Sequence, residues 1–416
     1  MEHSDLRERL RRLGVTRGAE RVTPPPRRKP RPIEELLPGE ILATEQGVCF
    51  LHREHYPLDY RHGGLSLSAL LEHPADVAAL LARDERLAAL DPTRWAFVDT
   101  ETTGLAGGTG TYAFLVGVGL FEGDGFTIHQ YFMRDYDEEP AQLHALAGVL
   151  DRLGAVVSFN GKSFDMPLLE TRFTMTRQAP RLSGAPHLDL LPVSRRIWKH
   201  RLESCALSNL EEAVLGVRRA QEDVPGWLIP GLYGDYVRSR DAREMPRIFY
   251  HNAQDILSLV VLAARLSSLL THPLASSQDG DIPGEDLYGL GRLLCDLGQG
   301  DRGQVALARA VEGCRLRSVR ELAMRDLAYL LKRQERRDEA LPWWQRLARE
   351  EGAIYAFEEL AKHYEWHARD IAQALAWTEE ALALVQGWPP GPRRREALAD
   401  LEHRLNRLRQ RLALGS

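Results

Sequence analysis

Two carboxylates separated by one residue point most directly to chemistry in this sequence. Asp99 and Glu101 follow the apolar run at residues 95–98. In a β-strand, residues i and i+2 project from the same face, so the two acids would lie side by side. Adjacent carboxylates repel each other and are costly to bury unless a cation lies between them. Because carboxylate oxygens are hard ligands, the pair predicts a site for Mg²⁺ or Mn²⁺ rather than for zinc.

Two later segments carry further polar side chains in a regular order. Residues 156–165 place Asn160 five positions before Asp165, and residues 250–259 place His251 four positions before Asp255. Residues four apart on a helix share one face. In chain order the three segments read Asp-x-Glu, Asn-x-x-x-Phe-Asp and His-x-x-x-Asp.

This succession resembles the DEDD superfamily of 3′–5′ exonucleases, which have the ribonuclease-H-like fold, over residues 93–272. Residues 195–198, 204–211, 215–218 and 223–230 are similar to the bacterial YprB-type branch. That branch includes mitomycin repair factor B, and its members often carry C-terminal helical repeats. The resemblance implies a 3′–5′ exonuclease that acts on DNA in repair, beside a helicase.

The resemblance also assigns roles to individual residues. Two Mg²⁺ or Mn²⁺ ions would be held by four carboxylates, with Asp99 as the ligand shared between them: Asp99, Glu101, Asp165 and Asp255. In the family, the general base or water-positioning residue is Tyr four residues, or His five residues, before the last Asp. Here the spacing is crossed, because His251 stands at the Tyr position and Tyr250 at the His position. We favour His251, since imidazole titrates near neutral pH, while the subclass stays open.

Substrate contacts are expected beside these acids. Thr102, Thr103, Gly104 and Leu105 would shape the pocket for the terminal nucleotide. Asn160 would contact the 3′ end or orient Asp165, Lys162 would meet a phosphate, and Tyr250 is a further substrate-binding candidate.

Other polar residues have structural explanations that compete with functional ones. Asn160 and Lys162 could equally be structural, and Asp189 is expected to be a helix cap or a buried acceptor. The basic residues around Trp198 suit either single-strand binding by charge and stacking or a solvated helix face.

Two other functions remain open. An RNA exonuclease would use the same acids, because sequence does not reveal the preference for a 2′-hydroxyl. An adaptor would bind a helicase or another repair protein through its repeats and hold a silent or partner-dependent nuclease domain. The presence of all four carboxylates argues against a silent domain.

Composition sets limits on the remaining classes of function. The chain has 416 residues and a net charge of −5, so any surface that binds nucleic acid must be a local patch. Its four cysteines form no Cys-x-x-Cys pair, which argues against a zinc site and for a reducing compartment. The N-terminus lacks the apolar stretch of a signal peptide, and no run of 18 apolar residues occurs. We therefore expect a cytoplasmic, nucleoid-associated protein.

The chain divides by composition and pattern. We expect a basic mobile arm at 1–35, a cover region at 36–92, an α/β nuclease domain at 93–272, a linker at 273–281 and tetratricopeptide-like helical repeats at 282–416. In the nuclease domain, strands are predicted at 95–100, 114–122, 125–132 and 155–159, and helices at 140–153 and 246–270. These elements would form a mixed sheet with helices on its faces. In the repeats, Asp301, Asp338 and Asp370 recur at spacings of 37 and 32 residues and are expected to cap similar helices.

Overall fold

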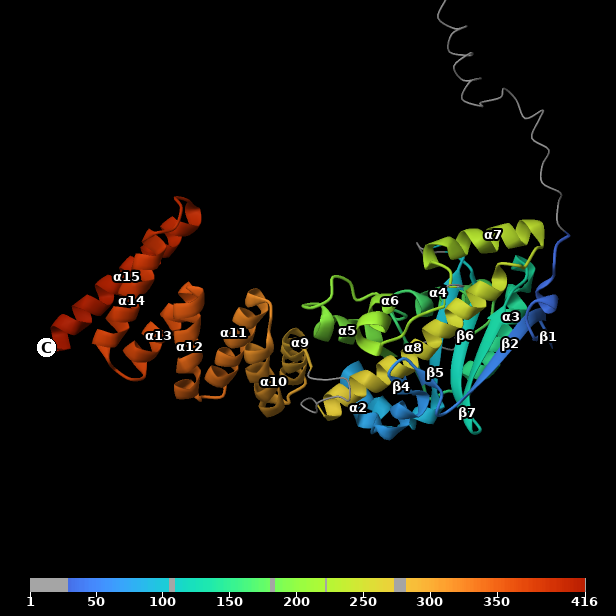
Figure 1. The fold of residues 1–416 in the computed structure, drawn as a ribbon, viewed down its shortest axis with the longest axis horizontal. Helices are drawn as coiled ribbons and strands as arrows, with labels where there is room; N and C mark the ends of the chain where they lie inside the picture. The colour runs from blue at the N-terminus through green and yellow to red at the C-terminus, as the bar shows by residue number, and fades with distance from the viewer. Residues whose placement is uncertain (1–28, 105–108, 180–183, 221–222, 273–281, 416) are drawn as a thin grey trace, which may run out of the picture.

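The chain forms an α/β body from which a row of helices extends to the C-terminus (Figure 1). The structure is a computed structural model that describes residues 29–104, 109–179, 184–220, 223–272 and 282–415. Leu105, most of the N-terminal arm and the expected linker lie outside these described residues.

A seven-stranded mixed sheet forms the centre of the body. Its strand order is β1-β2-β7-β6-β5-β8-β9. The strands are β1 (Glu40–Thr44), β2 (Gly47–Pro57), β5 (Trp95–Thr102), β6 (Ala113–Glu122), β7 (Gly125–Phe132), β8 (Ala155–Ser158) and β9 (His187–Asp189). A separate two-stranded ribbon joins β3 (Arg61–His62) to β4 (Leu65–Ser66). Strand β5 pairs antiparallel with β6 and parallel with β8, so it is an interior strand.

Helices cover both faces of this sheet. They are α2 (Ala75–Ala82), α3 (Glu139–Leu150), α4 (Asp165–Met175), α5 (Leu190–Trp198), α6 (Leu207–Leu210), α7 (Ile229–Ser239) and α8 (Met245–Thr271). Phe97 of β5 packs in one core with α8, whereas Ala96 and Val98 pack in another with α3 and α4. This alternation follows from the two-residue period of a strand.

The predicted fold class is confirmed, and the expected elements differ from the observed ones mainly at their ends. The hairpin turns between Glu122 and Gly125, as expected from its Gly-Asp-Gly sequence. Helix α8 extends one residue further at each end than predicted. Helix α8 is also the one described helix long and apolar enough to cross a membrane, but 78% of its most apolar window is buried inside the fold. Burial of that extent is typical of a core helix.

The region expected to be only a cover contributes to the sheet itself. Residues 50–57 of β2 pair antiparallel with β7, with Phe50 opposite Phe132, and β1 pairs with the other side of β2. The described end of the expected mobile arm is also fixed, because Ile33 is fully buried in a core with Phe50. An apolar side chain that fills a core anchors the backbone that carries it.

The C-terminal helices form successive neighbouring pairs. They are α9 (Gly284–Asp296), α10 (Gly300–Gly313), α11 (Arg317–Arg333), α12 (Arg337–Glu351), α13 (Ile354–Trp366), α14 (Ile371–Gln386) and α15 (Pro392–Gly415). Each packs on the next along the chain. Of the three expected caps, Asp370 accepts a hydrogen bond from the amide of Gln373 at 2.9 Å. The other two were placed wrongly, because Asp301 and Asp338 lie inside the first turns of α10 and α12.

The helical part shares a hydrophobic core with the α/β body. Leu290, Leu293 and Leu294 of α9 belong to the same buried cluster as much of α8. Trp198 is 2% exposed, so its indole cannot stack on a nucleotide base, and the single-strand binding interpretation of this cluster is wrong. Its basic neighbours instead form ion pairs with α9: Arg196 with Asp296, and Arg201 with Asp286.

The far end of α8 is also held by the helical part. Arg302 of α10 donates hydrogen bonds to the carbonyl oxygens of Leu270 and Thr271. These carbonyls belong to the last turn of α8, where no further residue of the helix can donate to them. The guanidinium therefore caps α8 from the neighbouring part of the molecule.

Candidate active site

Asp99 and Glu101, the two acids separated by one residue, lie near the end of strand β5. Asp99 and Glu101 project from the face that packs on α8, as their spacing predicts. The register with β6 is regular up to Glu101 and shifts immediately after it. A bulge at this point ends regular pairing, as is common beside active sites.

Asp165 is brought to the same region from the first turn of α4. The hydroxyl of Thr100 donates a hydrogen bond to its carboxylate, so β5 and α4 meet at this acid. Asp255 arrives from α8, and the four predicted carboxylates converge from three elements of the fold.

Burial raises the pKa of three of these acids. Desolvation, followed by the charges of Asp255, Glu101 and Asp165, raises the pKa of Asp99 well above its usual range. Desolvation is also the largest cause for Glu101, whose pKa rises to about 8, and for Asp165, whose pKa rises to about 6. Desolvation and the neighbouring acids therefore both favour the protonated forms of these carboxyls, and a cation bound among them would favour the ionised forms.

Helix α8 contributes three polar side chains to the site: His251, Asn252 and Asp255. His251 and Asp255 lie one turn apart, with Nε2 and Oδ2 3.6 Å from each other. Asn252 is fully buried, and its amide donates to the Asp99 carboxylate at 2.8 Å. The Asn252 carbonyl oxygen accepts from Gln130 at 2.9 Å, which fixes the orientation of the amide. Asn252 was not predicted from the sequence to have a role in the site.

A glycine on the neighbouring strand makes room for this contact. A Cβ atom on Gly117, which is paired with Asp99, would lie 2.1 Å from Oδ1 of Asn252. That distance is far shorter than any van der Waals contact, so the approach of Asn252 to Asp99 requires glycine here.

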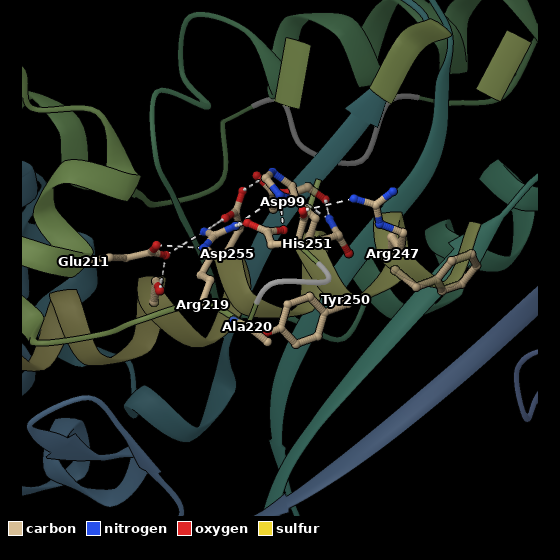
Figure 2. Close-up of polar contacts among 12 residues, drawn as sticks. Asp99, Glu211, Arg219, Ala220, Arg247, Tyr250, His251 and Asp255 are labelled. Carbon is tan, nitrogen blue, oxygen red and sulfur yellow. Dashed lines mark hydrogen bonds and ion pairs between the residues drawn. The ribbon is translucent and has the colours of Figure 1, made fainter. Parts of the chain in front are cut away.

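Arg219 belongs to the site, although it was not predicted from the sequence. Figure 2 shows its guanidinium between Glu211 and Asp255, and it forms ion pairs with both. Its Nε and Nη2 donate to the two oxygens of Glu211 at 2.8 and 2.6 Å. Its Nη1 lies 3.1 Å from Nδ1 of His251. The cation thus partly compensates the charges of Glu211 and Asp255.

His251 is held by a second carboxylate that was not predicted to have a role. Its Nδ1 lies 2.8 Å from Oδ1 of Asp223. Burial on its own would lower the pKa of His251, but the hydrogen bond to Asp223 and the charges of Asp255 and Glu101 outweigh it and raise the pKa to about 9. The fixed Nδ1 leaves Nε2 on the side of Asp255, which is the arrangement of an oriented imidazole.

The turn before α4 is organised by Asp189, which is a cap and acceptor as expected. Asp189 accepts hydrogen bonds from the backbone amides of Asn160 at 2.8 Å and Lys162 at 3.2 Å, and it caps α5 through Leu191. Asn160 has a φ of 67°, a left-handed conformation that asparagine tolerates. The side chains of Asn160 and Lys162 are exposed at the surface.

The hydroxyl groups of the predicted nucleotide pocket are used within the chain. Thr102 donates to the carbonyl of Gly104 at 2.8 Å, and Thr103 accepts from the amide of Tyr112 at 3.0 Å. The hydroxyl of Tyr250 accepts from the amide of Ala220 at 3.1 Å, and so it steadies the segment that carries Arg219. These side chains shape the rim of the site, and their contact with substrate stays a prediction.

The donor set fits a divalent cation. Glu101, His251 and Asp255 place ligand atoms within 4.8 Å of one another. Asp99 and Asp165 add carboxylates that influence the same group electrostatically. Desolvated acids with raised pKa values gain most from a nearby cation, and hard oxygen ligands suit Mg²⁺ or Mn²⁺.

Comparison with known proteins agrees with this geometry. Residues 96–267 match the RNase H superfamily, and they contain the four acids, His251 and Arg219. The chain is 31% identical over 348 residues to the uncharacterized protein YprB of Bacillus subtilis (strain 168), covering 82% of this chain and 81% of that protein. The chain therefore belongs to the YprB family, and its α/β body is an RNase H superfamily domain of the nuclease type.

Proposed function

We propose that the protein is a metal-dependent 3′–5′ exonuclease that hydrolyses DNA and serves in DNA repair. The observation that carries the proposal is the convergence of Asp99, Glu101, Asp165 and Asp255, with burial raising the pKa of the first three. Hydrolysis of a phosphodiester needs negative charge to be neutralised around the phosphorus, and acids in this arrangement can hold the cations that do so.

The four carboxylates would hold two divalent ions, which supply an activated water and stabilise charge on the leaving oxygen. The remaining chemistry belongs to the chain itself. His251 would orient the attacking water at Nε2, since Asp223 fixes its Nδ1 side at 2.8 Å. A pKa of about 9 keeps the imidazole protonated near neutral pH, so it would deprotonate that water only where bound cations lower this pKa. Asn252 holds the carboxylate of Asp99 in place through its 2.8 Å hydrogen bond.

We propose that residues at the rim of the carboxylate site recognise the end of the nucleic acid strand. Thr103 and Gly104 follow Glu101 closely in the sequence and Tyr250 precedes His251, so they would contact the terminal nucleotide, and the exposed Lys162 in the turn before α4 would contact a phosphate. DNA is favoured over RNA by the family resemblance. RNA remains the second candidate substrate, and a partner-dependent nuclease is the third possibility.

The proposal also includes a protein partner and a cellular location. We expect the C-terminal helices, which resemble tetratricopeptide repeats in spacing, to bind a helicase or another repair protein. A nuclease with this role would work in the cytoplasm at the nucleoid.

The test is a nuclease assay with matched variants. Wild type, Asp99→Asn and Asp124→Asn are incubated with 5′-labelled single-stranded DNA, duplex DNA and RNA, in Mg²⁺, Mn²⁺ or EDTA. Asp124 is the control, because its side chain is fully exposed in the turn between β6 and β7. We expect a ladder that shortens from the 3′ end, requires metal, survives Asp124→Asn and disappears with Asp99→Asn. The absence of cleavage from wild type under every condition would overturn the stand-alone enzyme.

A further inference from the structure

A hollow in the C-terminal helices is separate from the carboxylate site. It has a volume of about 400 Å³ and is enclosed by residues of α11, α12, α13 and α15. Figure 1 shows these helices in the part of the row that lies away from the α/β body. The proposed nuclease chemistry makes no use of this hollow.

The lining of the hollow is strongly basic. It includes five lysine or arginine side chains and one carboxylate: Lys332, Arg337, Lys362, Arg404, Arg407 and Glu359. The single acid accepts ion pairs from both lysines, Lys332 and Lys362. When Arg411 and the paired acids outside the lining (Glu335, Asp338, Glu358 and Glu365) are included, six positive charges meet five negative ones. The excess contrasts with the chain as a whole, whose net charge is −5.

A buried acid beneath the hollow fixes the arginines in position. The side chain of Glu365 is 0% exposed and pairs with Arg404 at 3.4 Å, Arg407 at 2.8 Å and Arg411 at 2.9 Å. One carboxylate cannot neutralise three guanidinium groups, so positive charge remains on side chains that are already ordered. Ordered donors lose less conformational entropy when an anion binds.

Apolar surface accompanies the charge. Trp344 is buried in the lining, next to Ala340 and Leu341. Trp366 is 57% exposed, although it is a large aromatic side chain, and Arg411 lies 4.7 Å from its ring centroid. Exposed aromatic surface beside ordered arginine is typical of binding-site anchors.

We propose that this hollow binds an acidic peptide segment of a partner protein, with carboxylates against the basic side chains and one bulky apolar residue against the tryptophans. The cations come from four different helices and surround one bounded hollow. A nucleic acid strand would instead need charge spread along a groove that follows its backbone. A short polypeptide can present both acids and an apolar side chain within such a space.

The test uses the full-length protein to select peptide ligands from a library. A phage-displayed library of random linear peptides is panned against wild type, with counter-selection on the double variant Lys362→Ala/Arg407→Ala. Arg404 and Arg411 still pair with Glu365 in this variant, so the helices keep their buried ion pair. Enriched peptides are then measured by fluorescence anisotropy, beside labelled single-stranded oligothymidylate. Arg409→Ala is the matched control, because Arg409 lies on the same helix and pairs with Glu379 outside the hollow.

The proposal expects enriched peptides in which acidic residues flank a bulky apolar one. Their binding should weaken about tenfold or more in the double variant and in Trp366→Ala, and change less than about twofold in Arg409→Ala. Three results would overturn it: no enrichment over the counter-selected variant, enriched peptides without acids, or oligothymidylate that binds in place of peptides with the same dependence on Lys362 and Arg407. Because the readout is binding, these outcomes are independent of nuclease activity.

Discussion

Replacement of Arg219 by alanine should strongly destabilise the α/β body. The guanidinium is 12% exposed and joins Glu211, on the segment after α6, to Asp255 on α8. Its removal leaves Glu211, which is 2% exposed, with the hydroxyl of Ser258 as its remaining side-chain donor. An uncompensated buried charge is among the few changes that destabilise a domain strongly.

The expected magnitude follows from the burial of the partners. Loss of one partner from a buried ion pair costs about 3–5 kcal/mol. Asp255 is 17% exposed and can be partly hydrated, so we expect a value near the lower end, about 3 kcal/mol. Each 1 kcal/mol shifts the melting temperature of a domain of this size by about 2–4 °C, so the variant should melt about 6–12 °C below wild type.

Thermal unfolding followed by circular dichroism measures this shift, and the neighbouring residue gives the control. Arg218 is exposed, so Arg218→Ala should stay within about 0.5 kcal/mol of wild type. The variant Arg219→Ala should also bind Mn²⁺ more tightly in calorimetry, because a cation no longer has to displace the guanidinium from Asp255. Equal melting temperatures for the two alanine variants would refute the assignment of Arg219 to the buried network.

Three further changes test other parts of the structure. Gly117→Ala should lower the free energy of unfolding by about 1–3 kcal/mol, since the new Cβ would lie 2.1 Å from Oδ1 of Asn252. The control Gly148→Ala has open space around the new Cβ and should not destabilise the protein. Equal melting temperatures for the two variants would contradict this prediction. Burial lowers the pKa of His187 to about 4, so below pH 6.5 the unfolded chain takes up a proton that the folded chain does not. Stability should therefore fall by up to about 1.4 kcal/mol per pH unit between pH 6.5 and 4, and His187→Gln should lessen the slope of urea midpoints against pH; an unchanged slope would exclude this role. Glu365→Ala should cost about 3–5 kcal/mol in urea unfolding of the helical part, because three arginines lose their buried partner, and a change under about 1 kcal/mol would show that they are solvated without it.

Two pairs of side chains in the site could be predicted because their geometry is local, whereas Asp165 was assigned by the family resemblance. Asp99 and Glu101 share a face through the period of a strand, and His251 and Asp255 share one through the period of a helix. Both relations depend on a few neighbouring residues, and the structure preserves them. The apolar run before Asp99 predicted the strand itself, and the structure places that strand, β5, inside the sheet.

Arg219 could not be predicted in the same way, because its position depends on the path of a loop. Gly216, with a φ of 68°, reverses the chain after Leu215, and the amide of Val217 then donates to the carbonyl of Glu211. This reversal turns Arg219 back toward Glu211 and leaves Arg218 outside. Two adjacent arginines look alike in sequence, and only the tertiary path distinguishes them.

The aromatic residue within the basic cluster on α5 was misread for a related reason. Basic residues beside Trp198 have the composition of a nucleic acid surface, and composition does not reveal a neighbouring element. Helix α9 covers the indole and supplies the acids that pair with Arg196 and Arg201. The residues of α9 lie far from α5 in the sequence, so no pattern near α5 indicates this contact.

The capping of α8 by Arg302 bears on whether the α/β body and the C-terminal helices can fold as separate units. A fragment that ends at residue 272 would lose the donor to Leu270 and Thr271 and would expose the apolar surface that now contacts Leu290 of α9. Such a fragment should aggregate rather than fold as a free nuclease. Gene fusion or domain shuffling between these parts would meet the same obstacle, so the helical row is part of the folding unit of the enzyme and not an interchangeable attachment.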